Sequence, residues 1–287
     1  MTGARPISLS EKAVPLSKEA IPLSKEESAR LGRDRLVATG HVEGRTVRWH
    51  IAEEVPVSLT YDGASSVVMM ATPADLEDFA FGFSVTEEMV DDPRHIDQVL
   101  VSETPAGILV DILTMPGSKS TAASRRRAIA GRTGCGLCGI ESLEEAVRPP
   151  RPVTPAFPFD VDAVARTFKD LPRHQPLNRV NRSVHAAAWA ESDGTIRLAR
   201  EDVGRHNALD KLIGALHRQG IDRAKGFIVM SSRCSFELVQ KAASAGVSGL
   251  ATVSAPTTLA LALAQRCGMR LAANSREGVV VFDDGQP

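Results

Sequence analysis

Long apolar runs are missing from this 287-residue sequence: no stretch of about 18 apolar residues, the length that crosses a bilayer, occurs anywhere in it. The first thirty residues also lack the charged-then-apolar pattern of a signal peptide. We therefore expect a cytoplasmic protein without a membrane partner. Only four cysteines are present, too few for a disulfide framework in a chain of this length, which favours a reducing compartment.

Net charge and aromatic side chains are equally scarce. A formal charge of −1 argues against a general nucleic-acid binder, so we predict no nucleic-acid partner. Aromatic residues make up 4% of the chain, and Trp49, Trp189 and Tyr61 are the few stacking candidates besides phenylalanine. The hydrophobic content of 43% is nevertheless sufficient for an ordinary core in one large domain or two small ones.

Composition divides the chain into three parts. Residues 1–35 contain a near-repeat with regularly spaced prolines, which predicts a disordered N-terminal tail. A proline-rich stretch around Pro149–Pro152 is a stiff, non-helical connection. It predicts a boundary between a β/α subdomain over residues 36–150 and an α/β subdomain over residues 151–287.

The first subdomain alternates like strands before its first helix. Asp62-Gly63 predicts a hairpin turn, and Thr72-Pro73 predicts the start of a helix that runs to about Val90. We expect a small antiparallel sheet from residues 46–51, 55–59 and 67–70, followed after the helix by strands near 99–101 and 107–113.

The second subdomain alternates short apolar strands with helices, a pattern typical of a mostly parallel sheet covered on both faces. Asp193-Gly194 predicts another hairpin. The expected helices span residues 161–171, 205–218, 236–245 and 256–267, and the expected strands span 184–190, 195–199, 226–230 and 250–253.

Cys135 and Cys138 lie in a glycine-rich stretch after a run of three arginines, Arg125–Arg127. The positive charge favours the reactive thiolate, and the glycines would let the backbone move or approach a large ligand closely. A structural zinc site would need two more ligands, but Cys234 and Cys267 lie in or beside apolar helix patterns. Structural zinc, a deaminase-type zinc site, a redox pair and sulfur carriage as a persulfide all remain open on spacing alone.

The polar stretch Arg200–Lys211 opens a predicted helix. Helical spacing places His206 beside Asp210 and Asn207 beside Lys211. The stretch is either a solvated helix face or one wall of a ligand site in which Arg205 and Lys211 meet phosphate. Other polar residues follow or begin predicted strands, where α/β sheets bind ligands: His185, Ser231–Arg233 and Ser254–Thr258.

Several of these segments together resemble the FdhD/NarQ family, the formate dehydrogenase accessory sulfurtransferases, over nearly everything after residue 45. The long Arg-Glu-Asp-Val-Gly-Arg-His-Asn stretch is far more specific than the cysteine pair. The matching segments are Glu54–Val57, Thr72–Ala80 with Gly82, Phe83 and Glu87, the Cys135/Cys138 pair, His185–Ala187, Arg200–Lys211 and Ser254–Thr257.

This resemblance implies a fold, an activity and a site. The fold would be α/β, with a cytidine deaminase-like core of mixed sheet covered by helices and a smaller N-terminal β-rich subdomain. The protein, a homodimer, would take sulfur from a cysteine desulfurase as a persulfide on Cys135, assisted by Cys138. It would pass the sulfur to the molybdenum (or tungsten) bis(molybdopterin guanine dinucleotide) cofactor of formate dehydrogenase, a client ligand and not a permanently bound cofactor.

The cofactor site implied by the resemblance lies near the C-terminus, and to it we add polar residues of the Arg200–Lys211 stretch. No resident metal is expected. Two alternatives are a chaperone that holds the cofactor without transferring sulfur and a zinc-dependent, deaminase-like enzyme. The assigned cofactor-binding residues are Asn274, Ser275, Arg276, Glu277, Gly278, Val279, Arg205, His206 and Lys211.

Overall fold

The computed structural model describes residues 37–42, 45–117, 151–153 and 155–282. The predicted tail over residues 1–35 and the Cys135/Cys138 pair lie outside the described residues. Within those residues, no helix is both long enough and apolar enough to cross a bilayer.

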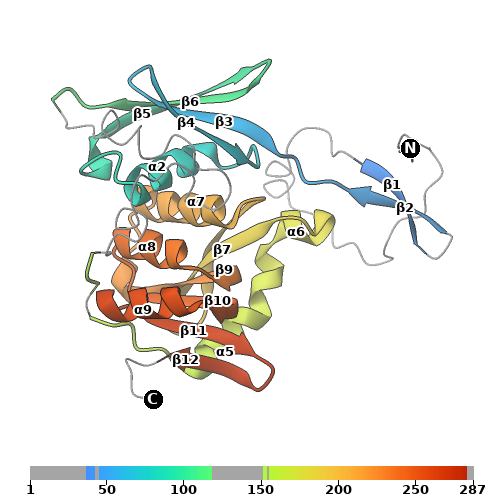
Figure 1. Cartoon of the computed structure of the whole chain (residues 1–287), viewed down its shortest axis with the longest axis vertical. Helices are drawn as coiled ribbons and strands as arrows, with labels where there is room; N and C mark the ends of the chain where they lie inside the picture. Colours follow the sequence, from blue (N-terminus) through green and yellow to red (C-terminus); the bar gives the residue numbers. More distant parts are fainter. Residues whose placement is uncertain (1–36, 43–44, 118–150, 154, 283–287) are drawn as a thin grey trace.

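A six-stranded sheet forms the centre of the second half of the chain (Figure 1). Its spatial order is β12-β11-β10-β9-β7-β8, and only the pairings among β9, β10 and β11 are parallel. The mostly parallel sheet predicted from the alternation of strands and helices is therefore wrong, and the mixed sheet implied by the family resemblance is confirmed. The strands are β7 (His185–Glu191), β8 (Ile196–Asp202), β9 (Gly226–Cys234), β10 (Gly249–Pro256), β11 (Arg270–Ser275) and β12 (Gly278–Phe282).

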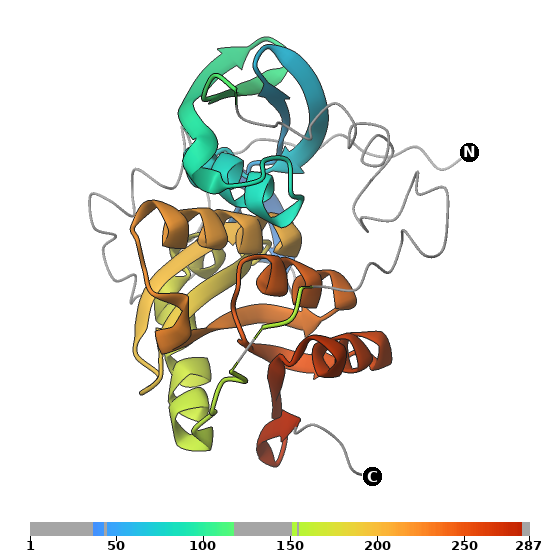
Figure 2. The ribbon, with the colours of Figure 1, turned by 90° about the vertical axis from the view of Figure 1, so that its left-hand side faces the viewer.

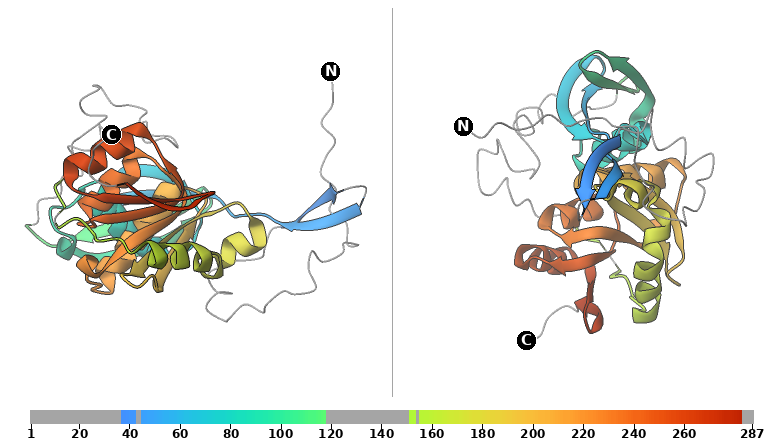
Figure 3. Two further views of the ribbon diagram at one scale, coloured as in Figure 1. Left: turned by 90° about the horizontal axis from the view of Figure 1, so that it is seen from below. Right: turned by 90° about the vertical axis from the view of Figure 1, so that its right-hand side faces the viewer.

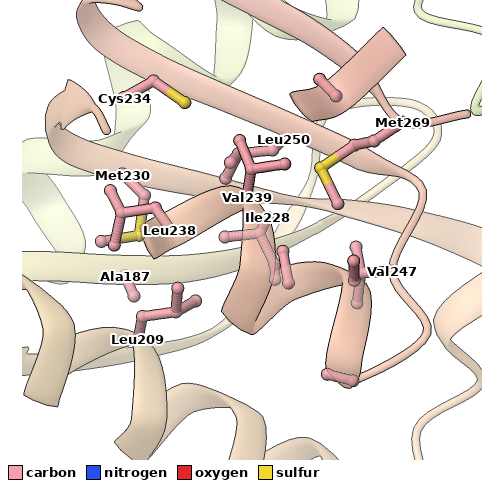
Figure 4. Close-up of a cluster of buried hydrophobic side chains, with 14 of the residues drawn as sticks. Ala187, Leu209, Ile228, Met230, Cys234, Leu238, Val239, Val247, Leu250 and Met269 are labelled. Atoms are coloured by element: carbon pink, nitrogen blue, oxygen red, sulfur yellow. The ribbon is translucent and has the colours of Figure 1, made fainter. Parts of the chain in front are cut away.

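Helices cover both faces of this sheet. On one face α7 (Arg205–Arg218), α8 (Phe236–Ser244) and α9 (Thr258–Cys267) bury their apolar stripes. Figure 4 shows Leu209 and Leu238 from the helices close to Met230 of the sheet. The other face is covered by α5 (Val161–Asp170) and by Leu171 of the short helix η2 (Leu171–His174). A further short helix, α6 (Pro176–Asn181), follows them.

A second, four-stranded sheet comes from the first half of the chain. Its order is β4-β3-β6-β5, and α2 packs its phenylalanines Phe79 and Phe83 against one face. The predicted Asp62-Gly63 hairpin is confirmed, with both residues in the left-handed region at φ 50° and 76°. The elements are β3 (Val55–Tyr61), β4 (Ala64–Ala71), α2 (Leu76–Thr86), η1 (Pro93–His95), β5 (Ile96–Thr104) and β6 (Gly107–Thr114).

The remaining short helix, η3 (Arg223–Lys225), and a two-stranded ribbon complete the fold. The ribbon pairs β1 (Val37–Val42) only with β2 (Arg45–His50) and projects away from both sheets (Figure 3). The expectation that residues 46–51 join the antiparallel sheet of residues 55–70 is therefore wrong. The ribbon contacts the body through Trp49, whose indole N–H donates to the carbonyl of Asn181 at 3.1 Å.

The two sheets are joined through α2 and α7, which lie side by side between them (Figure 2). Glycine allows the close approach at the crossing: a Cβ at Gly82 would collide with the carbonyl oxygen of Asp210, and one at Gly214 with that of Asp78. The backbones of the two halves of the chain are thus in direct contact.

The helices predicted in the second half agree with the structure to within two residues at each end, although α6 was not predicted, and the helix predicted in the first half differs more. The predicted helix 205–218 is confirmed at both ends. The helix predicted to run from Thr72-Pro73 to about Val90 begins instead at Leu76, after Asp75 in the left-handed conformation, and ends at Thr86. Thr72 is not its cap and instead binds the second half of the chain: its backbone N–H donates to Asp202 at 2.9 Å, and its hydroxyl accepts from the N–H of Val203 at 3.1 Å.

Candidate functional site

Polar residues converge at one edge of the six-stranded sheet. Because β8 and β9 are both antiparallel to β7, and β9, β10 and β11 are parallel, these four strands end at the same edge. We call it the carboxyl edge; it comprises His185, Asp202–His206, Ser231–Glu237, Ser254–Thr257 and Asn274–Val279. The ends of β9 and β10 and the β11–β12 turn lie on the right in Figure 1. Ligands of α/β sheets bind at such an edge.

The predicted segment Asn274–Val279 forms the tight turn between β11 and β12. The Ser275 hydroxyl holds the turn: it donates to the carbonyl of Gly278 at 2.7 Å and accepts from the N–H of Glu277 at 3.2 Å. Arg276 and Glu277 at the tip are exposed to solvent. An exposed guanidinium at this edge is available to an anionic ligand.

Arg205 and His206 form the first turn of α7, at the same edge. His206 is 15% exposed and faces Glu237 of α8, with 4.0 Å between its Nε2 and the Glu237 Oε2. Burial, with the charges of Lys241 and Arg205, lowers the pKa of His206 to about 3, so its imidazole is neutral at pH 7.

Lys211, in contrast, lies inside the protein. Its side chain is 0% exposed, and its ammonium group lies 2.6 Å from the carboxylate of Asp202 and donates to the carbonyl of Thr72 at 2.8 Å. The other oxygen of Asp202 accepts from the N–H of Gly204 and from the amide of Asn207, at 2.8 and 3.0 Å. Asn207 and Lys211 thus meet through Asp202.

Asp210 also points inward and joins three helices. It accepts hydrogen bonds from Thr86 of α2 at 2.7 Å and from Lys241 of α8 at 2.9 Å, and Lys241 also binds Glu87 at 2.9 Å. Burial raises the pKa of Asp210 to about 6, against the opposing effect of Lys241. The predicted pairing of His206 with Asp210 is therefore replaced by contacts with α8: His206 faces Glu237, and Asp210 binds Lys241.

The beginning of the polar stretch is likewise structural. Arg200, 6% exposed, donates to Asp78 of α2 at 2.8 Å. Asp78 also accepts from Arg218 at 2.6 Å. The Glu201 carboxylate accepts from the backbone N–H groups of Leu177 and Asn178, both at 2.8 Å, and so caps α6.

The other polar residues predicted at strand ends include some with structural hydrogen bonds and one that is exposed to solvent. The Ser231 hydroxyl accepts from the N–H of Ala186 at 2.8 Å, so it fixes β7 to β9. The Thr257 hydroxyl accepts from the N–H of Ala260 at 3.2 Å, as an ordinary helix cap. Arg233 is exposed. Burial and the charge of Arg205 lower the pKa of His185.

Sequence reasoning missed Ser235 and Glu237. Both stand at the start of α8, directly after a parallel strand, and that position was the available signal. Neither belongs to a recognisable motif, and the proximity of Glu237 to His206 depends on how α7 and α8 pack together.

The two cysteines within the described residues are both buried. Cys234 and Cys267 are each 1% exposed, and burial, with the charge of Glu237, raises the pKa of Cys234 to about 12. No group of three or more His, Cys, Asp or Glu side chains within the described part of the chain could hold a metal ion. The roles predicted for Cys135 and Cys138 lie outside the described residues and stay predictions.

Fold and edge together define a mixed α/β protein with arginine side chains and a neutral histidine at its strand ends. This chain belongs to the FdhD/NarQ family, whose model matches residues 52–284. The family resemblance seen in the sequence is thereby confirmed.

Curated relatives and one solved structure agree with this assignment. The chain is 47% identical to a sulfur carrier protein FdhD of Bordetella petrii, over 82% of this chain and 84% of that protein. It is 46% identical to the protein of the same name in Xanthomonas campestris, over 83% and 85%. The fold is shared with the crystal structure of a protein assigned as a formate dehydrogenase accessory protein in Desulfotalea psychrophila, with a TM-score of 0.68, 22% identity and coverage of 87% and 96%.

Proposed function

We propose that this protein carries sulfur for formate dehydrogenase. It accepts sulfur from a cysteine desulfurase as a persulfide on Cys135 and transfers it to the molybdenum (or tungsten) bis(molybdopterin guanine dinucleotide) cofactor before insertion into the enzyme. The observation that carries this proposal is the identity of 46–47% to proteins named sulfur carrier protein FdhD over more than four-fifths of the chain. Cys135 and Cys138 supply the thiols that such a role needs.

The proposed chemistry conserves electrons at each step. The Cys135 thiolate attacks the outer sulfur of the desulfurase persulfide, and the desulfurase cysteine leaves as a thiolate. When the terminal sulfur is passed to the cofactor, the Cys138 thiolate attacks the inner sulfur of Cys135. The transferred sulfur leaves as sulfide, the two thiols become a disulfide, and a cellular dithiol reductant reopens it.

The carboxyl edge suits the anionic client ligand. Arg276 is exposed at the β11–β12 turn and Arg205 lies at the start of α7, where guanidinium groups can bind diphosphate oxygens. The contribution that we propose for Lys211 is indirect: it fixes Asp202, which orders the backbone of Gly204 immediately before Arg205. The remaining residues of the proposed cofactor site are His206, Asn274, Ser275, Glu277, Gly278 and Val279.

The family assignment also motivates three structural proposals. A mixed sheet with helices on both faces is compatible with a cytidine deaminase-like core. We further propose a homodimer in the cytoplasm, with a cysteine desulfurase and formate dehydrogenase as partners. Analytical ultracentrifugation of the full chain tests the dimer directly.

Sulfur labelling tests the central proposal. Purified protein is incubated with a cysteine desulfurase and radiolabelled cysteine, and the label bound per chain is counted before and after thiol treatment. We expect thiol-labile label on the unaltered protein and on the matched control Cys267→Ala, and none on Cys135→Ala.

Two outcomes contradict sulfur transfer. Absence of thiol-labile label on the unaltered protein would support a chaperone that only holds the cofactor. Stoichiometric zinc in the purified protein, lost in the Cys135→Ala variant, would instead support the zinc-dependent alternative.

A further inference from the structure

The β1–β2 ribbon lacks what usually stabilises a pair of strands. It has no third strand among the described residues, and none of its described side chains is buried. An isolated two-stranded hairpin is at best marginally stable in water, and a further strand or packing on an apolar surface is needed to hold it. The hydrogen bond from Trp49 to Asn181 fixes the base of the ribbon, while the rest projects from the body (Figure 3). We therefore expect a partner to cover it.

One face of the ribbon is mostly apolar. Val47 and Trp49 lie two residues apart on β2 and so share a face. Opposite them on β1 are two small residues, Ala38 and Gly40. Trp49 and, just beyond the ribbon, Ile51 are large apolar side chains that are 38% and 44% exposed. An exposed aromatic residue next to exposed aliphatic ones is typical of a protein–protein interface.

Charge is distributed unevenly along this part of the chain. β1 and β2 contain two arginines, Arg45 and Arg48, and no acidic residue. Residues 51–54 contain Glu53 and Glu54 and no basic residue. A positive segment followed directly by a negative one is complementary to a second copy of itself that runs in the opposite direction. An acidic partner such as a nucleic acid would match the arginines but meet the glutamates with like charge.

We propose that the ribbon is an arm by which this chain pairs with a second copy of itself. Arg48 and Glu54 stand three residues before and three residues after Ile51; both are exposed, and neither has an ion-pair partner among the described residues. The two copies cross antiparallel at Ile51, so the two-fold axis brings Arg48 of each copy to Glu54 of the other. This inference rests on the proposed homodimer and assigns its interface. The family assignment does not imply it, because the ribbon precedes the residues that match the family model.

Beyond the crossing, the arm of one copy reaches the four-stranded sheet of the other. β3 begins four residues after Ile51, and the register places Met70 of β4 opposite Pro56 of β3. Val68 and Met70 alternate with residues packed on the α2 side, so they lie on the opposite, outer face of the sheet. They are 58% and 49% exposed. The apolar face of the partner's ribbon covers this end of the sheet.

Charge reversal tests the arm, with the dimer dissociation constant measured by sedimentation velocity on the full chain. Arg48→Glu brings two acidic side chains together at both contacts of the dimer, and Glu54→Arg brings two basic ones together. We expect each variant to raise the dissociation constant about 10-fold or more, because two ion pairs are lost and like charges meet. The matched control is Arg266→Glu on α9, an exposed arginine without an ion-pair partner among the described residues, and it leaves the constant unchanged.

Mixing the two variants gives the sharper result. In a dimer of one Arg48→Glu chain and one Glu54→Arg chain, opposite charges face each other at both contacts. An equimolar mixture should therefore regain the dissociation constant of the unaltered protein. An ion pair formed within one chain would not be restored by mixing, so the rescue identifies a contact between copies.

Three results would overturn the proposal: a chain that stays monomeric at every concentration, a dimer indifferent to Arg48→Glu, or charge-reversed variants that do not recover on mixing. Thermal unfolding checks that both variants are folded. The first result also contradicts the proposed homodimer, whereas the other two leave a homodimer with a different interface. Failure here is distinguishable from failure of the sulfur-carrier function, because sulfur labelling of Cys135 is measured separately and does not depend on Arg48.

Discussion

The two faces of the Arg200–Lys211 stretch differ in whether their polar groups have partners. On the inner face, Asp202, Lys211 and Asp210 are buried and fully engaged with other side chains and backbone groups. On the outer face, Arg205 and His206 keep polar atoms without partners among the described residues. A single polar motif thus contains a structural half, which joins the two sheets, and a half for which we propose ligand binding. Measurements of stability and of binding should separate the two.

Removing the charge of Lys211 should have the largest effect on the free energy of unfolding. Lys211→Met leaves the Asp202 carboxylate, which is 0% exposed, without its counter-ion. Breaking such a pair costs about 3–5 kcal/mol, so we expect urea unfolding to show a loss of that order. Arg205→Ala on the outer face is the contrasting variant and should cost less than about 1 kcal/mol. Equal losses in the two variants would erase the distinction between the faces.

Closing the glycine contact between α2 and α7 should have the next largest effect. In Gly214→Ala the new methyl group collides with the carbonyl oxygen of Asp78, and the helices must separate. Overpacking of this kind costs about 1–3 kcal/mol, measurable as a lower urea midpoint with an unchanged slope. The comparison variant is Ala215→Gly on the same helix, because it removes a methyl group instead of adding one. Gly220→Ala would not be a matched control, because Gly220 adopts a positive φ.

The pH dependence of stability should reveal His206. In the unfolded chain its imidazole takes up a proton below its ordinary pKa of 6.5, whereas in the folded protein the pKa is about 3. The unfolded state therefore binds more protons in this window, so stability rises with pH between about 3 and 6.5 and is fully present above it. His206→Asn should reduce the slope of unfolding free energy against pH by up to about 1.4 kcal/mol per unit. An unchanged slope would mean that His206 is solvated.

The smallest effect is expected at Cys234. Its thiol is buried and its pKa is about 12, so it cannot compete as a nucleophile at neutral pH. Cys234→Ala should leave the sulfur label bound per chain unchanged, in the assay where Cys135→Ala abolishes it. Loss of label in a folded Cys234→Ala variant would require a second sulfur-carrying thiol.

Local features of the fold were predictable from the sequence, and features set by packing were not. The boundaries of α7 follow from the spacing of Leu209, Leu212 and Leu216, all 0% exposed. Strand direction leaves no such trace, so the alternation of strands and helices predicted a mostly parallel sheet, and only the family resemblance implied the mixed sheet that the structure has. The β11–β12 hairpin was missed as secondary structure because its strands are short and β11 ends in polar residues.

The candidate site was predictable to the same extent. Residue types identified Arg205, His206 and Lys211 as polar neighbours, but only burial separates Lys211 from the other two. Glu237 was missed because its proximity to His206, 31 positions earlier in the sequence, depends on how α7 and α8 pack together. The family resemblance reached the correct family from the Arg-Glu-Asp-Val-Gly-Arg-His-Asn stretch, most of which serves the interior.

The buried charges between the sheets have a consequence for dissecting the chain. Lys211 donates a hydrogen bond to the carbonyl of Thr72, and Asn207 donates one to the carbonyl of Met70, so hydrogen-bond acceptors for the second half of the chain come from the first half. If the polypeptide is divided near residue 150 and the two fragments are produced separately, charged and amide groups of one fragment lose the partners that the other fragment supplies. We therefore expect the fragments to be insoluble apart and to recover structure only when refolded together.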